Sequence, residues 1–154
     1  RKVGESMAEP RPLHLRWPYL GLALIGGSLG TAAREAISLA IPDRAGIPAA
    51  IFGVNILGAF CLGLLLSALA RLGPDIGMRR RIRILVGTGF MGGFTTFSAL
   101  ATDTAGLLGE GRIGAGLAYG LATVIIGGLA TWAGIVVARR RTRRSDSSED
   151  GGAR

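Results

Sequence analysis

Residues 87–100 read GTGFMGGFTTFSAL, and this stretch is the most informative part of the chain. Two adjacent glycines, Gly92 and Gly93, precede two β-branched hydroxyl residues, Thr95 and Thr96. Both residue types disfavour a regular α-helix, because glycine loses the most backbone entropy and threonine loses side-chain freedom against the preceding turn. We therefore predict a helix that is interrupted inside an otherwise apolar segment.

This stretch belongs to the third of four apolar segments, at about residues 18–40, 48–70, 84–108 and 113–138. Each is long enough, as a helix, to cross a hydrocarbon core about 30 Å thick. Backbone groups released within a bilayer are tolerated only where they line a cavity or bind an ion. The sequence thus predicts an all-α membrane protein with four transmembrane helices, the third of them broken near the bilayer centre.

The charges of this 154-residue chain are segregated from its apolar segments, although 49% of the residues are hydrophobic and the net charge is +8. Of the 18 basic residues, 15 lie in residues 1–17, 71–83 and 139–154. The positive-inside rule places these parts, and so both termini, in the cytoplasm. We expect a multi-pass protein of the plasma membrane, and the segregation argues against binding to nucleic acid.

The predicted organisation is a cytoplasmic tail over 1–17, a transmembrane domain over 18–138 and a second cytoplasmic tail over 139–154. The last tail begins basic and then becomes rich in Ser, Asp, Glu and Gly, a composition typical of disorder. A single cysteine and a single histidine, Cys61 and His14, provide no metal-ligand spacing and no nucleophile pair. The sequence therefore does not predict an enzyme.

Glycine is unusually frequent, at 26 residues, and recurs with a spacing of four inside the apolar segments. This spacing is compatible with close contact between membrane helices, or with glycine richness alone. The pairs are Gly26 and Gly30, Gly89 and Gly93, and Gly116 and Gly120.

Three short motifs resemble those of the Fluc/CrcB family of fluoride ion channels. Residues 92–98, GGFTTFS, are similar to the family pattern Gly-Gly-x-Thr-Thr-Phe-Ser. Residues 52–58, FGVNILG, resemble the second-helix motif, in which Val-Asn is followed by Gly. Residues 26–34, GGSLGTAAR, resemble the first-helix motif Gly-Gly-x-x-Gly-Ala-x-x-Arg. The motifs occur in the right order and segments, so the resemblance covers about residues 18–138.

The resemblance implies an antiparallel dimer of four-helix subunits. It implies passive export of F⁻, which lowers the cytoplasmic fluoride concentration. It also implies a structural Na⁺ at the dimer centre, held by backbone carbonyls that by motif position belong to Gly92 and Thr95.

The fluoride pathway that the resemblance implies contains neutral hydrogen-bond donors. Asn55 would donate an amide N–H, Phe97 would present its ring edge, and Thr96 and Ser98 are candidate hydroxyl donors. The positive edge of an aromatic ring suits an anion, and neutral donors replace water around F⁻ without trapping it. For Asn55 the alternative is a structural hydrogen bond between helices.

Two further residues enter through the resemblance, and two positions depart from it. Tyr119 corresponds to the polar tyrosine of the family's fourth helix. Arg34 would lie at the pore mouth, where it attracts anions, or would be an interfacial arginine that snorkels. Leu100 replaces the second phenylalanine of a Phe-x-x-Phe pair, and Glu35 stands where the family often has tyrosine.

The strong charge bias suggests how the dimer forms, because an antiparallel homodimer needs a chain that inserts both ways. We hypothesise that this chain pairs with a homologous partner of opposite orientation; F⁻ conductance by the chain alone would argue against this. Two alternatives stay open. One is a non-conducting partner subunit of a heterodimeric channel, and the other is a small multidrug-type transporter that uses Glu35 as its carboxylate.

Overall fold

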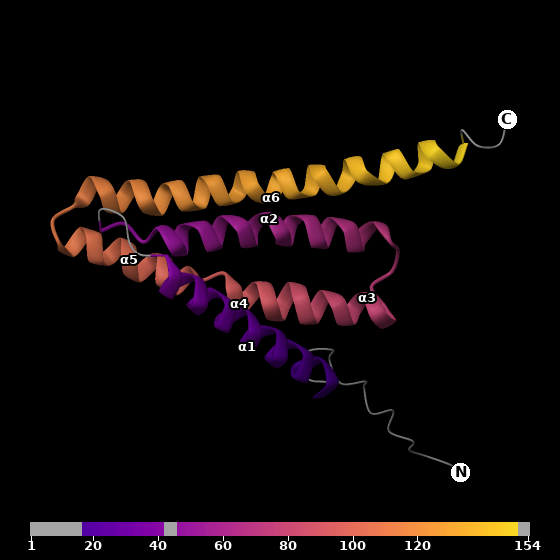
Figure 1. The fold of residues 1–154 in the computed structure, drawn as a ribbon, viewed down its shortest axis with the longest axis horizontal. Helices are drawn as coiled ribbons and strands as arrows, with labels where there is room; N and C mark the ends of the chain where they lie inside the picture. The colour runs from indigo at the N-terminus through magenta and orange to yellow at the C-terminus, as the bar shows by residue number, and fades with distance from the viewer. Residues whose placement is uncertain (1–16, 42–45, 151–154) are drawn as a thin grey trace, which may run out of the picture.

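The computed structural model describes the backbone of residues 17–41 and 46–150, and the side chains of these residues up to Arg140. These ranges form four helical rods (Figure 1). The all-α prediction is confirmed. The elements are α1 (Trp17–Ala40), α2 (Ala49–Arg71), α3 (Gly77–Ile82), the π-helical stretch η2 (Arg83–Met91), α4 (Gly92–Phe94), α5 (Phe97–Gly109) and α6 (Ile113–Asp150). The third rod consists of the consecutive short elements α3, η2, α4 and α5, from Gly77 to Gly109.

Proline and glycine mark the ends of these rods. Pro18 occupies the first turn of α1, where a missing N–H costs nothing, and Pro48 directly precedes α2. Beyond α2 the chain turns at Gly73, whose φ of 112° is left-handed, and Pro74 follows it. Gly111, with φ of 74°, makes the short turn between α5 and α6. The helix ends therefore follow from local backbone preferences.

Helices α2 and α6 lie side by side along their length, and the third rod runs on the other side of α2 (Figure 1). Helix α1 crosses the third rod at η2 and α4. Gly127 of α6 faces Ile56 and Gly134 faces Phe60, so α2 and α6 run in the same direction. This topology is that of an up-and-down bundle with short connections.

Glycines allow α1 and the third rod to approach backbone to backbone. A Cβ atom on Gly30 would overlap the carbonyl oxygen of Phe90, and one on Gly93 would overlap the carbonyl oxygen of Gly27. Such contacts are typical of membrane helices, where small residues let backbones pack closely. The close-contact interpretation of the glycine pairs is confirmed for these two rods.

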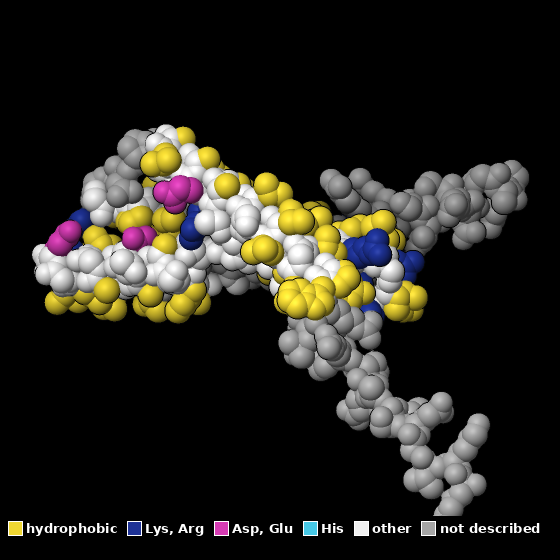
Figure 2. Space-filling model, turned by 90° about the horizontal axis from the view of Figure 1, so that it is seen from below, with side chains coloured by type: hydrophobic (Ala, Val, Ile, Leu, Met, Phe, Trp, Pro, Cys, Tyr) yellow, Lys and Arg dark blue, Asp and Glu magenta, His cyan; other side chains and the backbone are white. Residues whose placement is uncertain are grey.

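Three rods are long and apolar enough to cross a membrane: Ala49–Arg71, Gly77–Gly109 and Ile113–Arg140. Between 17% and 28% of their apolar windows is buried within the chain, so most of this apolar surface faces outward (Figure 2). Such large exposed apolar surfaces suit contact with lipid or another subunit.

The prediction of four spans is met in part. Helix α1 has the length of a span, at 24 residues, but it is not among the three helices that are apolar enough. The adjacent charges of Arg34 and Glu35, together with its glycines, lower its mean hydropathy.

Two boundaries differ from those predicted. The third rod begins at Gly77 rather than near residue 84, and α6 continues beyond residue 138 to Asp150. Arginine is a good helix former, so the arginine-rich flanks extend the helices that they border. The disorder expected at the end of the C-terminal tail lies, for residues 151–154, outside the described residues. The N-terminal tail lies outside them too, except for Trp17, the first residue of α1.

The contact at Gly30 leads to a stability prediction. Gly30→Ala places a methyl group against the backbone of Phe90, and we expect it to lower the free energy of unfolding by about 1–3 kcal/mol. Gly21→Ala is the matched control, because it lies in the same helix with no atom within 4 Å of the added Cβ. Thermal unfolding in detergent measures both, and equal melting temperatures would contradict this packing.

Candidate functional site

The third rod is interrupted at Thr95 and Thr96. Helix α4 ends at Phe94 and α5 begins at Phe97, and the two threonines between them have extended backbone, with φ and ψ of −81° and 152° and of −147° and 113°. Thr96 is the N-cap of α5, since its Oγ1 accepts a hydrogen bond from the Ala99 N–H at 3.1 Å. Threonine suits both the extended backbone and the cap.

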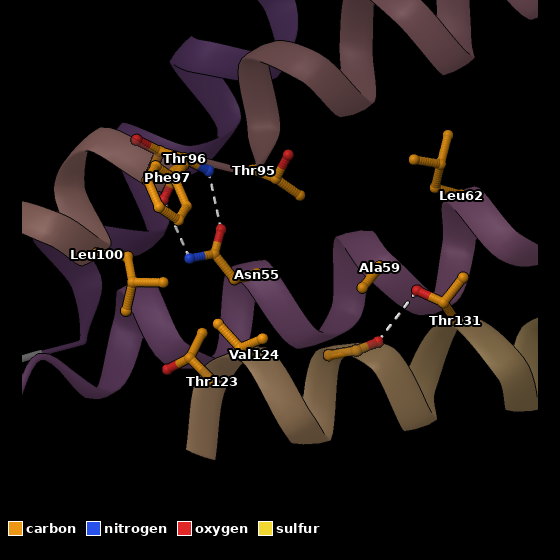
Figure 3. A pocket seen from close by; sticks show the side chains of 11 residues that line it. Asn55, Ala59, Leu62, Thr95, Thr96, Phe97, Leu100, Thr123, Val124 and Thr131 are labelled. Atoms are coloured by element: carbon orange, nitrogen blue, oxygen red, sulfur yellow. Dashed lines mark hydrogen bonds between the residues drawn. The ribbon is translucent and has the colours of Figure 1, made fainter. Parts of the chain in front are cut away.

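Asn55 of α2 holds this interruption through two hydrogen bonds to one residue (Figure 3). Its Oδ1 accepts from the Thr96 N–H at 2.8 Å, and its Nδ2 donates to the Thr96 carbonyl at 3.2 Å. The side-chain amide thereby pairs with an extended residue as a neighbouring β-strand would. Because Thr96 is buried, at 7% exposure, these bonds satisfy backbone groups that have little access to solvent.

The bonds from the Thr96 and Ala99 N–H groups to side chains leave two carbonyl groups without their usual helical donors. In a continuous helix the Thr96 N–H would bond to the Gly92 carbonyl, and the Ala99 N–H would bond to the Thr95 carbonyl. Here these two N–H groups bond to the side chains of Asn55 and Thr96 instead. The carbonyls of Gly92 and Thr95 are therefore available as oxygen ligands.

Asn55 and the interruption border an open-sided cavity of about 300 Å³ (Figure 3). The opposite wall comes from α6. The lining residues are Asn55, Ala59, Leu62, Thr95, Thr96, Phe97, Leu100, Thr123, Val124, Gly127 and Thr131. The cavity is mostly apolar, with amide and hydroxyl groups, and none of the described charged side chains lines it.

The structure brings Asn55, Thr96 and Phe97 together at this cavity, and Ser98 is joined to them by a hydrogen bond. The Ser98 Oγ lies 3.1 Å from the Thr96 Oγ1. Phe97 is 78% exposed, so its ring faces outward from the single chain.

Two predicted site residues lie outside this set. Tyr119 is buried against Leu100 and Leu107, and its hydroxyl donates to the Asp103 carboxylate at 3.2 Å. The Nε atom of Arg34, near the end of α1, is buried and has no hydrogen-bond partner among the described residues. Neither residue lines the cavity beside Asn55.

Sequence reasoning missed two hydroxyl residues on α6, Thr123 and Thr131, which line the cavity. Their Oγ1 atoms donate to carbonyls of their own helix, at Tyr119 (2.7 Å) and Gly127 (3.0 Å). The four-residue spacing from Tyr119 to Thr123 could have indicated a shared helix face. The bonds to their own helix leave the lone pairs of these hydroxyl oxygens, rather than their hydrogens, for other partners.

The fold and this site define a polytopic helical membrane protein with a polar interruption beside a cavity. The family described as CrcB-like protein, Camphor Resistance (CrcB), matches residues 21–135. The chain belongs to the CrcB family, and the resemblance inferred from the three motifs is confirmed.

Curated relatives align over most of the chain. The chain is 48% identical over 126 residues to the fluoride-specific ion channel FluC 2 of Leifsonia xyli subsp. xyli, covering 82% of this chain and 87% of the relative. It is 44% identical over 126 residues to FluC 1 of Cutibacterium acnes, covering 80% and 88%. FluC 1 of Streptomyces coelicolor is 40% identical over 124 residues, with coverages of 80% and 79%.

The hydrogen bonds of Asn55 generate a prediction about the interruption. Asn55→Ala leaves the N–H and carbonyl of Thr96 without these partners, so we expect the free energy of unfolding to fall by about 2–4 kcal/mol. We also expect faster hydrogen exchange at the Thr96 amide. Thr131→Val is the control, because it lines the same cavity but its hydroxyl bonds within its own helix. Unchanged exchange at Thr96 in Asn55→Ala would show that Asn55 does not hold the interruption.

Proposed function

We propose that this chain is a subunit of a fluoride-selective ion channel that exports F⁻ passively and so lowers cytoplasmic fluoride. The relatives are named fluoride-specific ion channels, and membership of their family makes the chain a channel protein rather than an enzyme. The observation that carries the proposal is the Asn55–Thr96 pairing at an interrupted helix, beside a mostly apolar cavity that carries neutral amide and hydroxyl groups.

The donors beside the interruption suit a small anion. The Asn55 amide uses one N–H on Thr96 and has a second to offer. Thr96 and Ser98 share one hydrogen bond between two hydroxyl groups, so whichever of them donates, the other keeps its hydrogen for a further acceptor. The exposed ring of Phe97 adds a positive edge. These neutral groups replace the water of F⁻ without a charge that would trap the ion.

A structural Na⁺ fits the available carbonyl groups. Hard cations are held by oxygen ligands, and the carbonyls of Gly92 and Thr95 lack their helical donors. Gly92 is exposed, and no neighbouring atom lies within 4 Å of the position that a Cβ would take there, so a second subunit has room to approach it. When bound there, such an ion would supply positive charge beside the carbonyls of Gly92 and Thr95 that would hold it.

We infer an antiparallel dimer, with the interruption near the bilayer centre and both termini of this chain in the cytoplasm. Helix α1 then forms the fourth span, since its polar face would lie against protein rather than lipid. The outward ring of Phe97 lies at a surface that a partner would cover. The charge bias favours a homologous partner of opposite orientation over a second copy.

Two alternatives are weaker. A non-conducting partner subunit is favoured only by Leu100, which is buried against Tyr119 and Leu107 and so serves packing. The small multidrug-type transporter needs a carboxylate deep in the first helix, whereas Glu35 is exposed and adjacent to Arg34. The family to which the chain belongs favours the fluoride channel over both.

Fluoride efflux from liposomes tests the proposal. The chain is reconstituted alone and together with a homologous chain whose loop charges are reversed, with Cl⁻ efflux as the selectivity control. We expect F⁻ efflux from the paired preparation and little from the single chain. Asn55→Asp in this chain should reduce the F⁻ rate at least about tenfold, because a carboxylate repels the anion and lacks the amide donor.

The arms of this experiment separate the two parts of the proposal. Absence of F⁻ efflux from both preparations would contradict the channel function. Fast F⁻ efflux from the single chain would leave the function intact and contradict obligate pairing.

A further inference from the structure

Residues 71–83, here called the basic connection, run from the last residue of α2 through α3 to the first residue of η2 and concentrate positive charge at one end of the molecule. Residues 71–83 contain five arginines and one acidic residue, Asp75, for a net charge of +4. Asp75 pairs with two of the arginines, Arg83 and, at 3.5 Å, Arg80. The positive charge of this connection therefore exceeds what its own carboxylate neutralises.

Apolar side chains are exposed among these arginines. Leu72, Ile76 and Met78 are 62%, 61% and 66% exposed. Water alone does not favour so many exposed large apolar groups on one connection, and hydrocarbon alone does not favour the arginines. A surface that combines exposed apolar side chains with arginines suits the boundary between the lipid headgroups and the acyl chains of a membrane.

A pocket of about 260 Å³ lies between the end of α2 and the third rod, and it has two chemically different sides. The apolar side consists of Leu66, Leu69 and Ala70 on the last turns of α2. The polar side consists of Gly73, Asp75, Arg79 and Arg83. Such a pocket fits a molecule with an anionic head and an apolar tail.

Arg79 is the arginine best placed to bind a ligand in this pocket. Its Nη1 lies so close to Gly73 that a Cβ there would be 2.7 Å away, so the absence of a side chain at Gly73 admits the guanidinium. Its bond to the Pro74 carbonyl is long, at 3.4 Å, and leaves most of its five donors for a phosphate.

The end of α6 adds further positive charge at the same level of the bundle. Because α2 and α6 run in the same direction, exposed Arg139 and Arg140 lie toward the end of α2 that carries the pocket. In Figure 2 the larger group of arginine side chains is at this end, next to exposed apolar groups. The arginines of the connection and of α6 thus form one basic end.

We propose that the pocket between α2 and α3 binds the headgroup of an anionic phospholipid, with the acyl chains along Leu66 and Leu69. The amphipathic lining favours a lipid over a free anion, and the exposed apolar groups favour a membrane over nucleic acid. Arginines immediately beyond a transmembrane helix recognise anionic lipids of the adjoining leaflet. This proposal is independent of which ion crosses the channel.

Thermal unfolding of the full chain in detergent tests the proposal, with three additives titrated separately: short-chain phosphatidylglycerol, short-chain phosphatidylcholine and inorganic phosphate. A ligand that binds only the folded state raises the melting temperature by an amount that grows with the logarithm of its concentration divided by its Kd. We expect phosphatidylglycerol to raise the melting temperature with a Kd at least about tenfold lower than that of phosphatidylcholine, and phosphate to have no effect at the same concentrations. Equal effects of the two lipids, or an equal effect of phosphate, would overturn the proposal.

Three charge variants locate the site. Arg79→Gln should weaken phosphatidylglycerol binding about fivefold, whereas Arg81→Gln removes the same charge from an exposed residue outside the pocket and should change it less than about twofold. Asp75→Asn should tighten binding, because it frees Arg80 and Arg83. Equal losses in Arg79→Gln and Arg81→Gln would indicate diffuse surface charge and contradict a pocket. Should Arg79→Gln not fold, Asp75→Asn and the lipid comparison still decide.

Discussion

The pairing of the Asn55 side chain with the Thr96 backbone is the interaction on which the site depends. One amide satisfies both the N–H and the carbonyl of a buried, extended residue, so the third rod is interrupted without leaving these two groups unpaired. In a hydrocarbon environment an unpaired backbone group costs several kcal/mol, so an interruption needs such a partner. The bond from the Thr96 N–H to Asn55 also leaves the Gly92 carbonyl without its helical donor, and the bond from the Ala99 N–H to the Thr96 hydroxyl does the same for the Thr95 carbonyl.

The packing of the rods places an open-sided cavity beside this interruption. Glycines of α1 meet the backbone of the third rod directly, which fixes one side of the interruption. Helix α6 packs along α2 and provides the opposite wall of the cavity. Phe97 remains on the outside of the single chain, so the cavity is open on the side where another subunit would complete it. This open side is compatible with the pair of chains that we propose.

Much of this architecture could be predicted from the sequence. Apolar length and segregated charge identified the helical rods, and the glycine and threonine content of residues 87–100 identified the segment that carries the site. Motif similarity identified the family, which the comparisons confirm. These features are local in the sequence, so no knowledge of the tertiary contacts was needed.

Other features depend on contacts between distant residues and could not be predicted. The choice of Thr96 as the partner of Asn55 requires α2 and the third rod to lie at one particular register. The cavity positions of Thr123 and Thr131 depend in the same way on the register between α6 and α2. The hydrogen bond from the Tyr119 hydroxyl to the Asp103 carboxylate likewise joins two residues that no motif connects.

The most direct test of this account is the infrared frequency of the Gly92 carbonyl, isolated by isotopic labelling of that one group in the purified protein. We expect a higher frequency than for the labelled carbonyl of Gly114, which lies within α6, because the Gly92 carbonyl lacks a helical donor. With the homologous partner chain present, we also expect a downward shift when Na⁺ replaces choline. A Gly92 frequency equal to that of Gly114 and insensitive to Na⁺ would contradict the claim that Asn55 frees this carbonyl to bind an ion.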